Sequence, residues 1–229
     1  MSRLIREMVA LSPSSFLKRR FCQTLFVIIM DGIFHSAAFA GEIKTSFDDI
    51  KVGAIPPGWK FGFLGASGHP HWAALAEKSA PSQPNVLLQD GKATYSWLVA
   101  EAITIKDGSV QCAFKIESGK EDPEAGLIVR FINGKNYYYV RANTLENDVV
   151  FYRMVHGKKE VVKRVEMMVD AKKWHKFRIE FKAEEFRVFY DDKAIMKLKD
   201  TKIKDAGSPG FWTTADTVAE FDDFNASGT

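Results

Sequence analysis

The sequence predicts an all-β protein that folds as a two-sheet antiparallel sandwich or jelly roll. Three observations support this fold class. Apolar residues recur with a period of two along many short runs, turn-forming pairs separate several of these runs, and no segment carries a sustained apolar stripe at helical spacing. The turn-forming pairs are Asp107-Gly108, Asn133-Gly134 and His156-Gly157. Short strands at intervals of about 8 to 12 residues are typical of sandwiches and jelly rolls.

The clearest strand runs from Lys176 to Lys182, where apolar and charged residues alternate. Strands at Phe186–Tyr190 and Ala194–Leu198 follow after short polar connections, which predicts an antiparallel meander. Strand-like runs upstream are Trp72–Ala76, Val86–Gln89, Ser96–Ile105, Ser109–Glu117, Ala125–Ile132, Asn136–Asn143, Asp148–Val155 and Lys159–Val165. The similar segments Ser46–Ile50 and Glu220–Phe224 are expected to belong to terminal strands that lie side by side.

Residues 1–40 have the features of a secretory signal peptide. The basic stretch Lys18-Arg19-Arg20 precedes an apolar run, and Ala38-Phe39-Ala40 offers a small-residue cleavage pattern. The apolar run, from Phe21 to Phe34, is shorter than the about 20 residues that span a bilayer and contains Asp31, so an uncleaved anchor is the alternative interpretation. The arginine pair leaves a twin-arginine route open as well. We expect cleavage near Ala40, a periplasmic or extracellular location, no membrane span in the mature chain, and one sandwich domain over residues 41–229.

Removal of the signal peptide changes the charge of the protein. Residues 1–40 contain five basic and two acidic side chains, so residues 41–229 carry 27 of each and have no net charge. Without a basic excess or a basic block, nucleic acid is not an expected partner. Cys22 leaves with the signal peptide, so Cys112 has no cysteine in the mature chain with which to form a disulfide. Its position in phase with Val110, Phe114 and Ile116 predicts a buried thiol.

Several motifs resemble a known family. They include Pro56-Pro57-Gly58-Trp59, the strand Asn136–Asn143 and the closing run from Gly210 to Asp216. Further matches are Ala80–Leu87, Ala125–Phe131, Glu146–Val150, Trp174-His175 and Phe221–Phe224. On these residues the chain resembles exported bacterial domains with a concanavalin A-like (laminin-G-like) sandwich, often labelled family 16 glycoside hydrolase-like or 3-keto-disaccharide hydrolase-like. The resemblance covers nearly the whole mature chain and implies a concanavalin A-like jelly roll.

The enzymatic labels of this family are not supported by a catalytic motif in the sequence. Family 16 enzymes carry Glu-x-Asp-x-x-Glu, or a bulged version, along one strand, so that alternation points the carboxylates into the cleft. The densest acidic stretch here, residues 117–124, contains Gly119 and Pro123 and is predicted to be a loop. We therefore expect no catalytic residues of this type.

Strand alternation predicts a polar and aromatic ligand-binding face. If Leu127, Val129 and Phe131 face the core, Arg130 faces the other side of its sheet, and the same alternation applies to the next two strands. Aromatic rings that stack on sugar faces and guanidinium groups that bridge hydroxyls are suited to a saccharide. Alternatively, these arginines are ordinary exposed residues that pair with carboxylates across strands. The predicted ligand-binding residues are Arg130, Tyr137, Tyr139, Arg141, Asn143, Arg153 and Trp212, with Trp212 expected to be exposed.

Carboxylates near the two ends of the domain suggest a structural calcium site, because calcium prefers oxygen ligands. The candidates are Asp48, Asp49, Asp222 and Asp223, with Asp122 and Glu124 as an alternative set. The simpler interpretation is that these carboxylates are solvated at strand ends. His69 and His71 supply only part of a transition-metal site.

Taken as a whole, the sequence favours an exported carbohydrate-recognition domain, similar to a lectin, without its own catalytic motif. A glycoside hydrolase-like enzyme that gathers carboxylates from separate strands is one alternative. A structural or interaction domain of the cell envelope, without a small ligand, is the other.

Overall fold

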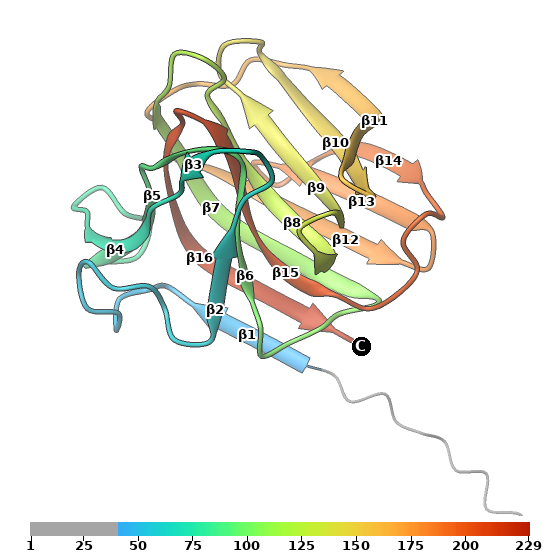
Figure 1. Cartoon of the computed structure of the whole chain (residues 1–229), viewed down its shortest axis with the longest axis horizontal. Coiled ribbons are helices and arrows are strands. Elements are labelled where there is room, and N and C mark those ends of the chain that lie inside the picture. The colour runs from blue at the N-terminus through green and yellow to red at the C-terminus, as the bar shows by residue number, and fades with distance from the viewer. Residues whose placement is uncertain (1–40) are drawn as a thin grey trace, which may run out of the picture. The chain divides into compact units, whose positions relative to one another are not determined.

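The computed structural model of the protein describes residues 41–229 as sixteen strands joined by turns and loops. The strands form two antiparallel sheets of eight strands each, which face each other as two layers (Figure 1). Among the described residues, no helix has the length and apolar character needed to cross a membrane. The predicted signal peptide, residues 1–40, lies outside the described residues.

The first sheet has the strand order β14-β13-β12-β7-β16-β5-β4, and β1 pairs with the free part of β16. β16, the last of the described strands in the sequence, therefore lies inside the sheet rather than at an edge. The strand bounds are β1 (Gly41–Thr45), β4 (Trp72–Ala76), β5 (Asn85–Gln89), β7 (Gly108–Ser118), β12 (His175–Lys182), β13 (Glu185–Tyr190), β14 (Lys193–Lys199) and β16 (Val218–Gly228).

The second sheet has the strand order β11-β10-β9-β8-β15-β6-β2, and the two-residue strand β3 pairs with β6. It is the layer nearer the viewer in Figure 1. The strand bounds are β2 (Trp59–Gly62), β3 (Gly68–His69), β6 (Lys92–Ala100), β8 (Glu124–Asn133), β9 (Asn136–Asn143), β10 (Asp148–Val155), β11 (Lys158–Glu166) and β15 (Ser208–Ala215).

The predicted fold class and the predicted meander β12-β13-β14 are confirmed. The terminal strands do lie side by side, with Gly41 opposite Gly228 and Thr45 opposite Phe224. The predicted opening strand is wrong in its position, because residues 46–50 form a turn after β1. The predicted strand Ser96–Ile105 is shifted, since β6 begins at Lys92 and ends at Ala100.

A hydrophobic core fills the space between the two sheets. Aromatic side chains from both layers meet there, including Phe114 and Phe177 of the first sheet and Phe151 and Phe211 of the second. Cys112 is buried in this core, as predicted, and burial raises the pKa of its thiol. Removal of this much apolar surface from water is the main source of stability in a domain without disulfides.

A second hydrophobic cluster lies on the outer face of the second sheet, away from the core. It contains Trp97, Tyr137, Tyr139, Tyr152 and Trp212, all with less than a tenth of their surface exposed. An outer sheet face that is both aromatic and closed to solvent is unusual, because one face of an antiparallel sheet is commonly solvated. This face contains three of the predicted ligand-binding residues, Tyr137, Tyr139 and Trp212.

Candidate functional site

Four aromatic rings stack in a continuous row across the outer face of the second sheet. Tyr95 of β6 stacks on Trp212 of β15, with 5.8 Å between ring centroids. Trp212 stacks on Tyr139 of β9 at 4.4 Å, and Tyr139 stacks on Tyr152 of β10 at 5.0 Å. We call these four residues the aromatic row. Such offset stacks are favourable and hold each ring in a fixed orientation.

Gly126 of β8 makes the centre of the aromatic row possible. It lies opposite Trp212 on one side and Arg141 on the other. A Cβ atom at this position would be 1.8 Å from the carbonyl oxygen of Val140, so β8 and β9 approach more closely than any side chain at residue 126 permits. Without a side chain there, Trp212 and Tyr139 meet across β8.

Four polar atoms on this face are buried and have no hydrogen-bond partner among residues 41–229. They are the indole nitrogens of Trp97 and Trp212 and the hydroxyls of Tyr137 and Tyr139. Burial raises the pKa of both tyrosine hydroxyls. The Trp212 indole lies close enough to the Tyr137 hydroxyl to oppose the rise in the pKa of Tyr137. The two groups do not reach hydrogen-bond geometry. A buried polar group without a partner costs about 1–3 kcal/mol, so four on one face need an explanation.

Arg141, at one end of this face, is held by carboxylates of the protein itself. Its Nε atom is 2.6 Å from Glu124 Oε1, a second nitrogen pairs with Asp148, and the third donates to Glu146 Oε2 at 3.1 Å and to the Tyr152 hydroxyl at 3.2 Å. Only 1% of the residue is exposed. Arg141 was predicted to bind a ligand, whereas in this structure its nitrogens face carboxylates of the protein, and its role is to order them.

Asn143 joins the two acidic residues of the alternative calcium set. Its Nδ2 atom donates to Asp122 Oδ1 at 2.8 Å and to Glu124 Oε1 at 3.0 Å, and its Oδ1 atom accepts from two backbone N–H groups. The pKa of Glu124 is raised from 4.5 to about 7, chiefly by burial and further by Asp122, while Arg141 opposes the rise. Glu124 is therefore the titratable group closest to neutral pH beside the aromatic row.

Arg130 does not belong to this face, contrary to the prediction. It has a φ of +51° in a stretch where the pairing of β8 with β9 shifts register, and this irregularity reverses the expected alternation. Its side chain lies against the Phe186 ring and donates to the carbonyls of Lys106, Ala183 and Ile203. Phe131, predicted for the core, packs on the outer cluster instead.

Arg153 is also separate from the aromatic row. In β10 the residues on the outer face are Val150, Tyr152 and Met154, which were predicted to face the core. Arg153 has the opposite orientation and pairs with Asp200 and Glu160, both at 2.5 Å. The predicted patch of three arginines is therefore wrong. The alternative pairing of arginines with carboxylates is found for Arg141 and Arg153, but Arg141 is buried rather than exposed.

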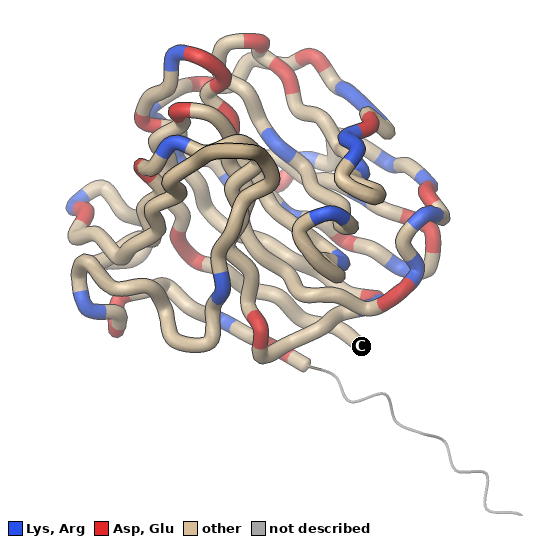
Figure 2. Tube along the Cα trace, viewed as in Figure 1, with Lys and Arg blue, Asp and Glu red and all other residues tan. Residues whose placement is uncertain are grey.

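Trp212 is fully buried, so the prediction that it is exposed is wrong. Leu64 and Phe131 pack against the cluster from above, and the Lys159 Nζ atom lies 5.2 Å from the ring centroids of both Tyr95 and Tyr152. Leu64 belongs to the connection between β2 and β3. This connection, residues 63–67, contains no Lys, Arg, Asp or Glu, and Figure 2 shows it as an uncharged stretch in front of the second sheet. This loop and Lys159 cover the aromatic row.

Sequence reasoning missed Tyr95, Tyr152 and Lys159 as members of this face. For Tyr95 and Trp97 a signal was available, because two aromatic residues two positions apart on one strand share a face. For Lys159 there was none, since nothing in a strand pattern indicates that a lysine reaches back over its own sheet.

The four aspartates predicted to bind calcium are only partly brought together. Asp48, Asp49 and Asp223 line a hollow on the outer face of the first sheet. Asp222 is buried and accepts hydrogen bonds from the backbone and hydroxyl of Ser82, both at 2.9 Å. Within the described part of the chain, no three His, Cys, Asp or Glu side chains are arranged to hold one metal ion. Calcium binding stays a prediction.

The two histidines of the partial metal site are accounted for separately. His71 Nδ1 lies 2.5 Å from Asp90 Oδ1 in an exposed pair, while His69 belongs to β3.

Comparison with known proteins gives likeness in structure but not in sequence. No protein-family model matches the chain, and no curated protein matches it. The carbohydrate-binding module CBM66 from Bacillus subtilis superposes with a TM-score of 0.61 at 18% identity, over 73% of this chain and 94% of that one. A mixed linkage glucan GH16 protein from Bacteroides ovatus, solved with a product, superposes with a TM-score of 0.55 at 8% identity, over 81% of this chain and 99% of that one. A β-1,3-1,4-glucanase (lichenase) from a mouse hindgut metagenome superposes with a TM-score of 0.53 at 10% identity, over 82% of this chain and 98% of that one. At such identities the likeness concerns the fold, and it shows that residues 41–229 form a concanavalin A-like sandwich.

Proposed function

We propose that the chain is a saccharide-binding domain without catalysis of its own, and that the saccharide lies on the aromatic row. One observation carries the proposal. The outer face of the second sheet gathers four buried polar atoms that have no hydrogen-bond partner among residues 41–229, and all four belong to tyrosine or tryptophan side chains. Structural neighbours that include a carbohydrate-binding module and glucanases support the same class of ligand.

The chemistry of the face is suited to a neutral sugar. Tyrosine and tryptophan rings stack on the C–H faces of a pyranose or furanose ring, and their O–H and N–H groups bind its hydroxyls. The hydroxyls of Tyr137 and Tyr139 can donate or accept, whereas the indoles of Trp97 and Trp212 only donate. A saccharide that supplies hydroxyl oxygens and hydrogens therefore satisfies all four atoms at once.

Binding requires the cover to move. The loop between β2 and β3 is held by few contacts to the sheet: the Leu64 N–H donates to the Thr94 carbonyl at 3.2 Å, and β3 has only two residues. The Lys159 ammonium group lies over the rings of Tyr95 and Tyr152, which it contacts through cation–π interactions. Displacement of Leu64 and Lys159 opens the row to solvent, and we propose that a bound saccharide replaces these two side chains on the rings.

The hydrolase alternative has a specific difficulty at this face. A retaining glycosidase needs two carboxyl groups about 5–5.5 Å apart, one free to attack and one to protonate the leaving oxygen. Glu124 and Asp148 flank Arg141, and both are ion-paired to its guanidinium. Catalysis would require Arg141 to leave both of them, so binding alone is the simpler proposal. If the signal peptide is cleaved as predicted, the proposed binding takes place in the periplasm or outside the cell.

The test is binding of the full chain to a glycan array and to soluble polysaccharides, followed by titration of tryptophan fluorescence. Tyr139→Phe removes one unpartnered hydroxyl from the aromatic row, and we expect it to weaken binding by about 10-fold. Tyr190→Phe is the matched control, because Tyr190 also has a buried hydroxyl without a partner among residues 41–229 but lies in the core of the sandwich. It should bind as the unchanged protein does.

A variant with an opened cover makes the test decisive. Lys159→Ala removes one covering side chain and should strengthen binding or speed it. If neither the unchanged chain nor Lys159→Ala binds any glycan, the outer face is a second hydrophobic core and the domain is a structural or interaction module.

A further inference from the structure

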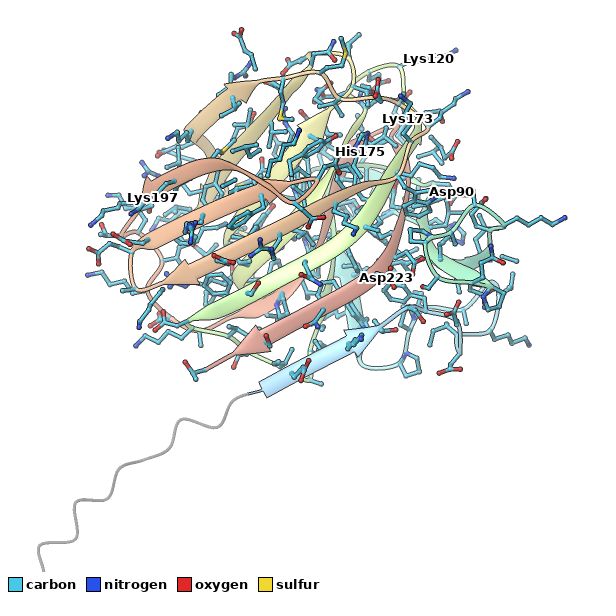
Figure 3. The ribbon with its side chains drawn as sticks, turned by 180° about the vertical axis from the view of Figure 1, so that it is seen from behind. Asp90, Lys120, Lys173, His175, Lys197 and Asp223 are labelled. Atoms are coloured by element: carbon cyan, nitrogen blue, oxygen red, sulfur yellow. The ribbon has the colours of Figure 1, made fainter. Side chains whose placement is uncertain are left out.

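A hollow lies on the opposite side of the sandwich from the aromatic row. It has a volume of about 570 Å³ and opens on the outer face of the first sheet. Figure 3, which views the molecule from behind, shows Asp223 of β16 on this side. Volumes of about 300–1,000 Å³ are typical of small-molecule sites, so the hollow is large enough for one.

The hollow exists because a small residue lies between longer ones. Ala113 of β7 is directly between Asp222 of β16 and Lys176 of β12. In the neighbouring row, Gln111 lies between Asn225 and Arg178. The methyl group of Ala113 leaves a depression that the amides of Gln111 and Asn225 border.

Asp223 faces this depression because of a local irregularity. The pairing of β16 with β7 shifts register between Asp222 and Asn225, and Asp223 has a φ of +48°. Because β16 contains an extra residue here, the side chains of Asp222 and Asp223 point in different directions. Asp222 is buried against Ser82, while Asp223 is exposed and lines the hollow.

Opposite charges lie on opposite flanks of the hollow. Asp48, Asp49 and Asp223 occupy the flank formed by β16 and the turn after β1, where Lys44 also lies. Lys176 and Arg178 of β12 occupy the other flank, with Asp192 at its rim. Over the residues that line the hollow, the flank beside β16 is therefore net negative and the flank on β12 is net positive. Since β7 separates β16 from β12, their backbones are roughly 10 Å apart.

Arg178 is held in place on the positive flank. Its guanidinium lies 3.6 Å from the ring centroid of Phe189 and is ion-paired with Glu180. A planar guanidinium fixed in this way presents its remaining N–H groups in one direction, which favours a carboxylate partner. The residues that line the hollow thus offer carboxylates at one end, amides in the middle and cations at the other end.

We infer that this hollow binds a small zwitterion of dipeptide size, with its ammonium group at Asp48, Asp49 and Asp223 and its carboxylate at Lys176 and Arg178. The amides of Gln111 and Asn225 then face the peptide group of the ligand. A calcium ion or another simple cation would engage only the acidic flank, and a simple anion would engage only the basic flank.

Isothermal titration calorimetry on the full chain tests this with L-alanyl-L-alanine as the probe. Its N-acetylated and C-amidated forms each lack one of the two charges. We expect the free dipeptide to bind and each capped form to bind at least about 10-fold more weakly. Equal binding of the free and capped forms, or no heat with the free dipeptide at millimolar concentration, overturns the inference.

Two variants and one control locate the site. Ala113→Leu fills the depression without removing a charge and should abolish dipeptide binding, whereas Ala113→Ser keeps it open and should preserve binding. Asp223→Asn removes one exposed charge, does not depend on how a larger side chain packs, and should weaken binding about 10-fold. Unchanged affinity in both Ala113→Leu and Asp223→Asn refutes the site. Glycan binding on the other sheet should be unaffected in all three variants, so failure here is distinguishable from failure of the saccharide proposal.

Discussion

Replacement of Glu124 by Gln should change the way in which the stability of the protein depends on pH. Burial raises the pKa of this carboxyl from 4.5 to about 7 in the folded protein, with a further contribution from Asp122, against the attraction of Arg141. Below about pH 4.5 the group is protonated in both the folded and the unfolded chain. Between about pH 4.5 and 7 the unfolded chain releases this proton while the folded chain retains it, so the folded state loses stability as the pH rises.

The size of the effect follows from the shift. A difference of about 2.5 pKa units corresponds to about 3 kcal/mol, and the loss is complete above about pH 7. Gln cannot ionise, so Glu124→Gln lacks this contribution and keeps an oxygen that accepts from Asn143. The free energy of unfolding of the variant, relative to the unchanged protein, should rise by about 3 kcal/mol between about pH 4 and pH 8.

Urea unfolding followed by tryptophan fluorescence at several pH values measures this difference. Glu101→Gln removes a carboxylate with 56% of its side chain exposed and controls for the general loss of one negative charge. If the relative stability of Glu124→Gln is the same at the two ends of the pH range, the carboxyl is not held at a raised pKa, and our account of burial at this end of the aromatic row is refuted.

Three further changes test other parts of the structure. Gly126→Ala should lower the free energy of unfolding by more than about 2 kcal/mol, measured by urea denaturation, because the new Cβ atom would lie 1.8 Å from the Val140 oxygen; a neutral substitution contradicts the close approach of β8 and β9. Asp222→Ala should destabilise the fold by about 1–3 kcal/mol, since Ser82 loses the acceptor of two hydrogen bonds, and an unchanged melting temperature would show that these bonds contribute nothing. Tyr139→Phe should leave the free energy of unfolding unchanged or raise it by up to about 1 kcal/mol, because the hydroxyl that it removes is buried without a partner among residues 41–229; a clear loss of stability would show that this hydroxyl is bonded.

The sheets were predictable from the sequence because alternation is a direct consequence of strand geometry. The bounds of β9 and β10 agree with the predicted ones, and both have many buried residues on each face. The opening strand was misplaced because Ser46–Ile50 resembles the real strand at Glu220–Phe224. The two segments are alike in composition, but the residues that pair with β16 are Gly41–Thr45, which precede Ser46.

The candidate site was predictable only as far as alternation holds. Tyr137, Tyr139 and Arg141 do share a face, as predicted, because β9 pairs regularly with β10. Arg130 was misassigned because the sequence around it contains no sign of the register shift. The burial of Trp212 could not be predicted either, since it depends on a loop from residues more than a hundred positions earlier in the chain.

The place of β16 in the first sheet has a consequence for how the protein is made. This strand pairs with β7 on one side and with β5 and β1 on the other, so without it the sheet separates into three parts: β14-β13-β12-β7, β5-β4 and β1 alone. The ribosome supplies residues 218–228 after the other fifteen described strands, and contacts between such distant segments form slowly. The chain therefore cannot complete this layer before these residues have been made. We expect a version shortened before Val218 to remain unfolded, and its protease sensitivity would show this.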